Sequence, residues 1–185
     1  MSQQTQPNPV ALFEGASSRM AQLLVGVKND QLNSPTPCSE WTVNDLIGHI
    51  QGGAEGLAAK LSGSSPEGAQ GGNDAAASYK TAVSRTLEAA KDPANLEKSV
   101  EAGGNEMPGG QFLSIMFLDH LVHCWDLAKA TGQDTAMDTS LVDACYGMFV
   151  PAIDQFRSDR FAAAMTVSDS ASNHDKLIAF MGRQP

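Results

Sequence analysis

Charged residues are scarce in this chain of 185 residues, and basic residues are scarcer than acidic ones. Charged side chains make up 18% of the sequence, below the usual quarter, which excludes a highly charged disordered chain and a coiled coil. Lysine and arginine number 12 and aspartate and glutamate 21, so the formal net charge is −9. Phosphate backbones repel a chain this acidic, so we expect no nucleic-acid partner. The composition is compatible with a site for a small molecule.

Signals for membranes and export are also lacking. No apolar run approaches the roughly 18 residues that a membrane span needs, so we expect no membrane partner. The first nine residues contain neither the basic nor the apolar segment of a secretion signal. Cys38, Cys124 and Cys145 are an odd number, lie far apart and form no Cys-x-x-Cys motif. We therefore expect buried, reduced thiols and a cytoplasmic location.

The hydrophobic pattern predicts an all-α chain that forms one domain over residues 1–185. No segment shows the alternation that is typical of a strand. Four long helices with turn-rich connections are typical of a helix bundle. The apolar residues that recur at three- and four-residue steps place these helices at about 9–28, 42–61, 74–90 and 111–131.

Local signals define the rest of the chain. Thr42 and Asp45 approximate a capping box at the start of the second long helix, and Gly132 ends the fourth. Residues 1–8 are expected to be flexible, and the Gly- and Ser-rich residues 62–73 to form a surface loop or a mobile flap. The remaining expectations are a helix from Ser140 that ends or kinks between Pro151 and Arg160, and a C-terminal appendage over 161–185. In this appendage we expect an extended piece at 161–167 and a short helix at 175–181.

The fourth long helix is apolar nearly all round, except for one polar strip. At 100° per residue Asp119, His123 and Asp126 lie within about 60° of one another. Asp119 and His123 are four residues apart, one turn along the same face, a chelating geometry comparable to that of His-Glu-x-x-His. Imidazole and carboxylate together suit Zn²⁺, and also Ni²⁺ or Fe²⁺. The strip therefore predicts two ligands of a metal site.

A third ligand must come from another helix, and His49 in the second long helix is the candidate. Gly53 and Gly56 lie on the same side of that helix and leave His49 unshielded. The alternative for His49 is a half-buried histidine that is hydrogen-bonded to a backbone carbonyl. His120 is the competing ligand, because His120 and His123 are spaced i, i+3; the alternative for His120 is a flanking position.

The sequence leaves two roles open for Asp126 and predicts one role for Cys124. Asp126 either orients His123 from outside the ligand set or pairs with Lys129 or solvent. Cys124 points away from the strip and is expected to be a structural thiol. His174 lies in a polar tail and is expected to be exposed.

Three stretches of the sequence resemble one superfamily. Residues 36–49 (TPCSEWTVNDLIGH) resemble the second-helix signature of the DinB-like and mycothiol-dependent maleylpyruvate isomerase N-terminal superfamily. Residues 119–132 (DHLVHCWDLAKATG) resemble its metal-helix signature. Residues 174–185 (HDKLIAFMGRQP) are similar to the Gly-Arg-x-Pro ending of a stand-alone, single-domain branch.

The resemblance implies an antiparallel four-helix bundle that holds a divalent metal, most often zinc, with nickel as the alternative. The family's ligands fall on His49, Asp119 and His123. In the isomerase the acidic ligand is glutamate, so Asp119 is a departure by one methylene. The larger isomerases carry an additional C-terminal domain that the resemblance does not cover, so it does not extend to maleylpyruvate isomerisation itself.

The predicted function is that of a metal-dependent enzyme that uses a low-molecular-weight thiol, mycothiol or a similar one, in a transferase or isomerase reaction. A metal with an open position lowers the pKa of a bound thiol. The alternatives are a metal-assisted hydrolase and a non-catalytic, stress-related metal-binding bundle. The expected partners are a small-molecule thiol and a substrate, with Arg183 either gripping an anion or lying at the surface. The apolar helix faces and the apolar residues Met148 and Phe149 are compatible with a homodimer.

Overall fold

The computed structural model describes residues 8–38, 40–66, 75–151 and 163–185, and the described chain is mostly helical. It separates into two compact units, residues 1–134 and residues 135–185. The expectations for residues 1–7, for most of the loop at 62–73, for 154–160 and for the start of the piece at 161–167 fall outside the described residues.

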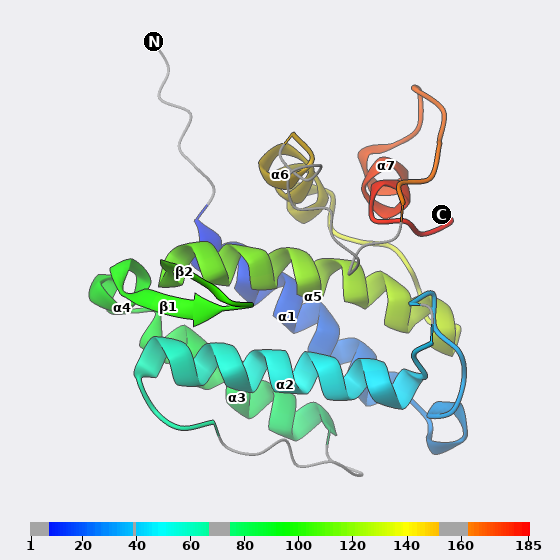
Figure 1. Ribbon diagram of the computed structural model, residues 1–185. Coiled ribbons are helices and arrows are strands. Elements are labelled where there is room, and N and C mark those ends of the chain that lie inside the picture. The colour runs from blue at the N-terminus through cyan, green and yellow to red at the C-terminus, as the bar shows by residue number, and fades with distance from the viewer. Residues whose placement is uncertain (1–7, 39, 67–74, 152–162) are drawn as a thin grey trace. The chain divides into compact units, whose positions relative to one another are not determined.

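Four long helices lie side by side in the first unit (Figure 1). Two of them, α1 and α2, each pack against both α3 and α5. A short 3₁₀ helix, η1 (Asn29–Gln31), follows α1. The four helices predicted from the hydrophobic pattern are confirmed within a few residues, as α1 (Pro9–Gly26), α2 (Val43–Ser62), α3 (Ala75–Ala89) and α5 (Gly109–Thr131).

The helices that carry the candidate ligands have the ends that the sequence predicts. The Asp45 backbone N–H donates to the Thr42 hydroxyl oxygen at 3.2 Å, and the Thr42 N–H donates to an Asp45 carboxylate oxygen at 2.9 Å. This capping box begins α2. Gly132 has a φ of 69° directly after α5, the left-handed conformation that favours glycine at a helix end.

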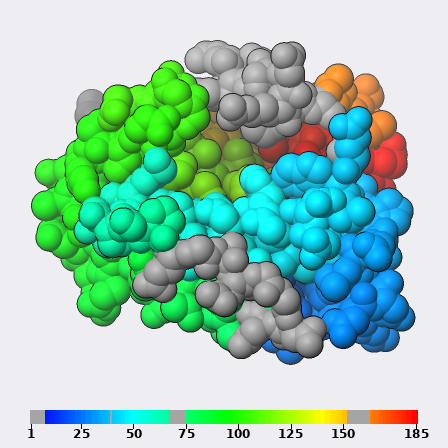
Figure 2. Space-filling model, turned by 60° about the horizontal axis from the view of Figure 1, so that its bottom comes forward, coloured from blue at the N-terminus to red at the C-terminus, as the bar shows by residue number. Residues whose placement is uncertain are grey.

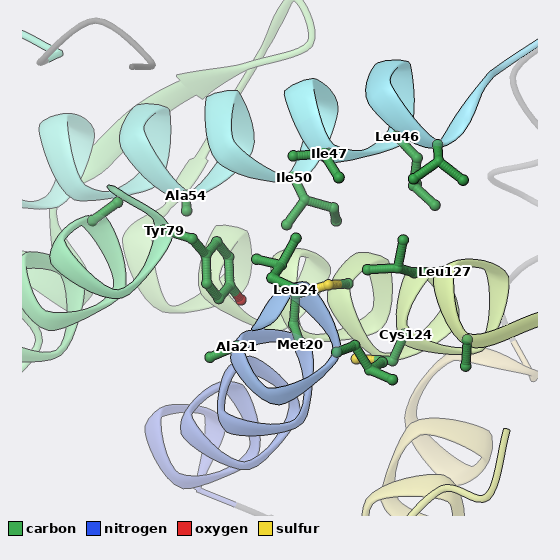
Figure 3. Close-up of a cluster of buried hydrophobic side chains, with 14 residues drawn as sticks. Met20, Ala21, Leu24, Leu46, Ile47, Ile50, Ala54, Tyr79, Cys124 and Leu127 are labelled. Atoms are coloured by element: carbon green, nitrogen blue, oxygen red, sulfur yellow. The ribbon is translucent and has the colours of Figure 1, made fainter. Parts of the chain in front are cut away.

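Apolar side chains from all four long helices meet in the core of the first unit (Figure 3). Met20 of α1, Ile50 of α2, Tyr79 of α3 and Leu127 of α5 are each at most 1% exposed. Fully burying an apolar side chain of this size contributes about 1.5–3 kcal/mol. These contacts hold α2 alongside α5, which is the arrangement that the candidate site requires.

A short β-hairpin lies between α3 and α5, and the expectation that no strand is present is wrong here. Strands β1 (Ser99–Ala102) and β2 (Asn105–Pro108) pair antiparallel, after a short helix α4 (Pro93–Glu97). Gly103 and Gly104 join the strands with φ of 61° and 84°. Two left-handed residues in a two-residue loop are what a hairpin turn of type I′ needs, and Gly-Gly provides them.

The second unit contains helices α6 (Thr139–Phe149) and α7 (Asn173–Phe180), as the sequence predicts. The Asn173 side chain on α7 donates to the Asp143 carboxylate on α6 at 2.7 Å. Residues 163–167 form no strand, and Gly182, with a φ of 79°, follows α7. In the described part of the chain, none of the helices has the length and apolar character needed to cross a bilayer.

Candidate metal centre

The three predicted ligands lie together where α2 runs beside α5. His49 Nε2 lies 3.2 Å from Asp119 Oδ1, and His123 Nε2 lies 3.5 Å from the same oxygen. One ligand atom from each side chain lies within 4.8 Å of the other two. In a tetrahedral zinc site with bonds of about 2.0–2.1 Å, neighbouring nitrogen and oxygen ligands are about 3.3 Å apart. The three side chains, hereafter the triad, therefore fit a divalent ion.

One side of the triad is open. The side chains of His49 and Asp119 are 37% and 27% exposed, whereas that of His123 is 9% exposed. A β-carbon built at Gly52 or Gly56 of α2 would meet no heavy atom of the described residues within 4 Å, and one at Gly53 would meet only the end of the Met116 side chain. Figure 2 shows a hollow between α2 and the hairpin, with side chains of α5 at its bottom. A small molecule can therefore approach these helices closely.

A tight loop before α2 adds an aromatic ring to the site. The Trp41 ring is stacked on that of His123, with centroids 5.9 Å apart, and lies 4.8 Å from that of His49. The loop is held by Thr36, whose N–H donates to the Trp41 carbonyl at 3.1 Å and whose hydroxyl oxygen accepts from the Cys38 N–H at 3.2 Å. This loop therefore brings both Trp41 and Cys38 to the site.

The other edge of the His123 ring faces Asp126. His123 Nδ1 lies 2.9 Å from Asp126 Oδ2, and Asp126 is fully buried. A neutral His123 that donates from Nδ1 to this carboxylate presents the lone pair of Nε2 towards Asp119 and His49. This is the geometry that an orienting residue needs. The Lys129 ammonium lies over the Trp125 ring, 5.1 Å from its centroid.

When the triad holds no metal, interactions within and beside it shift the pKa values of Asp119 and His123 in opposite directions. Burial by itself raises the pKa of Asp119, but His123 and His49 outweigh it and hold the pKa of that carboxyl well below its usual range. Burial likewise lowers the pKa of His123, but Asp119, Asp126 and Cys38 outweigh it and raise the pKa well above its usual value. Asp119 and His123 therefore form an ion pair at neutral pH.

This ion pair predicts how the stability of the metal-free protein depends on pH. The lowered pKa of Asp119 stabilises the fold above pH 3.8, and this contribution is lost as the pH falls through the folded-state pKa. The raised pKa of His123 stabilises the fold below pH 6.5, and this is lost as the pH rises through the folded-state pKa. In the presence of a chelator, the difference in Tm between wild type and Asp119→Asn should therefore be largest between pH 3.8 and 6.5. A difference that keeps growing towards alkaline pH would contradict the ion pair.

His120 does not join the triad. Its side chain is fully buried, and its ring lies 5.2 Å from that of Phe13 and 5.7 Å from that of Tyr79. Among the described residues, neither ring nitrogen has a hydrogen-bond partner, and Nδ1 lies 3.7 Å from Asp119 Oδ2. Burial lowers the pKa of His120 to about 4, so the ring is neutral. The structure thus places this alternative ligand in the core.

Replacement of His120 by leucine is expected to leave metal content unchanged, because the imidazole lies on the core side of α5. The free energy of unfolding should change by no more than about 1 kcal/mol, because an apolar side chain of similar volume replaces buried nitrogens without partners. Elemental analysis and urea denaturation measure the two quantities. A folded His120→Leu protein that binds no metal would place His120 among the ligands.

The expected burial of the three cysteines is right for two of them. Cys124 and Cys145 are buried, and burial raises the pKa of each thiol to about 12. Cys38 is half-buried, because it lies in the loop before α2 instead of on the inner face of a helix. Cys38 Sγ lies 3.2 Å from Asp126 Oδ2 and 3.8 Å from His123 Nδ1. The sequence predicted a buried thiol at this position and not its contacts with His123 and Asp126.

Two residues of the tail lie in the second unit. His174 is half-buried instead of exposed, and its Nδ1 lies 2.9 Å from Asp175 Oδ1. The Arg183 guanidinium donates to the Met181 carbonyl at 2.7 Å. Whether Arg183 also binds an anion stays a prediction.

A groove of about 720 Å³ between α1 and α3 contains none of the triad residues. Its walls include Ala21, Val25, Val83 and Leu87, with Lys80 also among the lining residues. Within the described residues, the two groups of side chains that could hold a metal both contain His123 and lie outside this groove. The triad is therefore the stronger candidate for chemistry.

Comparison with known proteins identifies the family. Residues 13–128 match the model of the mycothiol maleylpyruvate isomerase N-terminal domain. The chain belongs to this family. Two relatives of the chain come from Mycobacterium tuberculosis, strains CDC 1551 / Oshkosh and ATCC 25618 / H37Rv, and bear the description "uncharacterized protein". Each is 36% identical over 180 residues, which cover 95% of this chain and 98% of the relative. No solved structure matches. The matched range contains the whole triad and Asp126.

Proposed function

We propose that the protein is a divalent-metal-dependent enzyme on an antiparallel, DinB-like four-helix bundle. His49, Asp119 and His123 hold the ion, which is zinc, or nickel as the second choice. The observation that carries this proposal is the convergence of two imidazoles and a carboxylate from α2 and α5. His49 and Asp119 are 70 residues apart in sequence, yet their side chains meet at a place that is open on one side.

The side chains around the triad have complementary roles in this proposal. A divalent ion held by three side chains supplies a position at which a thiol or a water molecule binds with a lowered pKa. Asp126 holds the Nδ1 proton of His123 and so keeps Nε2 available. The ring of Trp41 shields one side of both imidazoles from water. The glycines of α2 leave room for the substrate.

The proposed reaction transfers or isomerises a small substrate with a low-molecular-weight thiol, mycothiol or a similar one, as cosubstrate. The family's description supports this class, since it names a mycothiol maleylpyruvate isomerase. The net charge of −9 favours small-molecule partners over nucleic acids. Metal-assisted hydrolysis by the same triad, and a stress-related bundle in which the metal only stabilises the fold, are the outcomes against which the proposal is tested.

The first test measures metal and thiol dependence together. The protein is purified without a His-tag, and its metal content is measured by elemental mass spectrometry. Thiol consumption is then followed with an activated aryl chloride and with mycothiol, glutathione or cysteine in turn. About one zinc or nickel per chain and thiol consumption above the rate without protein are expected, and the thiol consumption should be lost in Asp119→Ala, which lacks one ligand of the triad.

The alternatives give different results in the same assays. Ester hydrolysis that needs the metal but no added thiol would identify a hydrolase. Bound metal without turnover, together with a large loss of stability on chelation, would identify a structural site. Absence of metal, with no uptake on adding zinc, would overturn the catalytic proposal.

A further inference from the structure

A second group of potential ligands lies on the opposite edge of the His123 ring. It consists of Cys38, His123 and Asp126, and one ligand atom from each lies within 4.8 Å of the others. The three distances are 2.9 Å from His123 Nδ1 to Asp126 Oδ2, 3.2 Å from Cys38 Sγ to Asp126 Oδ2, and 3.8 Å from Cys38 Sγ to His123 Nδ1. The triad uses Nε2 of the same ring, so the two groups share a residue but not an atom.

These distances fit a metal ion that is bound by sulfur, nitrogen and oxygen. With Zn–S bonds of about 2.3 Å and Zn–N or Zn–O bonds of about 2.0–2.1 Å, tetrahedral geometry puts sulfur about 3.5 Å from its neighbours and nitrogen about 3.3 Å from oxygen. The observed distances differ from these values by less than about 0.5 Å. Thiolate and imidazole together prefer zinc and softer ions, whereas the triad offers no sulfur.

We propose that Cys38, His123 and Asp126 form a second cation site, which offers a thiolate ligand and is mutually exclusive with the triad. A neutral imidazole has one N–H and one lone pair, so it binds a metal through one nitrogen at a time. An ion on Nδ1 moves the ring proton to Nε2 and withdraws His123 from the triad. An ion bound at Cys38 therefore switches the triad off.

The position of Cys38 strengthens this inference. Cys38 lies in the loop before α2, where its N–H donates to the Thr36 hydroxyl oxygen, and Trp41 of the same loop is stacked on the His123 ring. An ion between Cys38 and Asp126 would therefore tie this loop to α5 without unfolding either. The half-exposed thiol gives the ion a route from solvent, whereas Cys124 and Cys145 are buried.

The test is a cobalt titration of the full-length, metal-free protein in a phosphine reductant, because a bound cysteine thiolate gives cobalt a near-ultraviolet charge-transfer band. The proteins are wild type, His49→Ala, Cys38→Ser and, as the matched control, Cys145→Ser. Circular dichroism checks the fold of each. We expect His49→Ala to bind about one cobalt with the thiolate band at full intensity, and Cys38→Ser to bind about one cobalt with the band abolished. The control should behave as wild type.

Failure of this inference is distinguishable from failure of the triad. A folded His49→Ala protein that binds no cobalt, or binds it without the thiolate band, would overturn the second site and leave the triad standing. A folded Cys38→Ser protein that binds no cobalt, while His49→Ala binds it with the band, would overturn the triad instead. A wild-type protein that binds two cobalt ions per chain would overturn the mutual exclusion.

Discussion

Replacement of His123 by alanine is expected to lower the affinity for zinc by more than about 100-fold, since even the loss of a residue outside the ligand set costs roughly 10–100-fold. Among the described residues, His123 belongs to both groups of potential ligands. Its loss therefore removes Nε2 from the triad and Nδ1 from the second group together. Competition with a chromophoric chelator measures the affinity, and elemental analysis should find metal content falling from about one ion per chain to a trace.

His174→Ala is the matched control for this prediction. His174 also lies next to a carboxylate, with its Nδ1 2.9 Å from Asp175 Oδ1, but it belongs to the second unit and to neither ligand group. The control should bind zinc as wild type does. Wild-type affinity in a folded His123→Ala protein would mean that the metal is held elsewhere, and both proposals would fall.

Asp126→Asn is expected to weaken zinc binding by roughly 10–100-fold, although Asp126 is not a ligand of the triad. The carboxylate accepts a hydrogen bond from His123 Nδ1 at 2.9 Å. An asparagine can turn its amide NH₂ towards Nδ1, which then accepts and leaves the ring proton on Nε2, the nitrogen that the triad needs. The affinity of the variant, measured across neutral pH, should depend on pH differently from that of wild type because a charge beside His123 is lost.

Zinc affinity and Tm together distinguish an orienting role of Asp126 from a purely structural one. If Asp126 only stabilised the fold, Asp126→Asn would lower the Tm and leave the zinc affinity of the folded protein unchanged. The control is Asp175→Asn, which removes the carboxylate beside His174 and should change neither the affinity nor its pH profile.

The long helices and the triad could be predicted from local information. The periodic apolar residues define the four long helices, and the capping box of Thr42 and Asp45 marks where α2 begins. Once α5 is a helix, the four-residue spacing places Asp119 and His123 on one face. His49 could be proposed as their partner because Gly53 and Gly56 leave its side of α2 bare.

Two features depend on information that helix periodicity does not contain. The position of Cys38 beside Asp126 follows from the turn that Thr36 fastens and from the packing of that loop on α5. The burial of His120 depends on which helices flank α5, since its ring is enclosed by Phe13 of α1 and Tyr79 of α3. A helical wheel gives only the direction of that side chain.

The hairpin between α3 and α5 was missed for a different reason. Its strands have four residues each, too few for alternation to stand out. The Gly103-Gly104 pair is nevertheless a recognised hairpin signal, so this feature could have been read from the sequence.

The bare face of α2 also has a consequence for local unfolding. Four of its 20 residues are glycine, and each glycine in a helix interior lowers intrinsic helix propensity by about 0.5–1 kcal/mol relative to alanine. The helix that carries His49 is therefore maintained by its capping box and its core contacts and not by its own propensity. We therefore expect α2 to open more readily than a helix with the same contacts and no interior glycine would. A ligand bridging α2 and α5 would suppress this opening, so binding is expected to slow amide hydrogen exchange in α2.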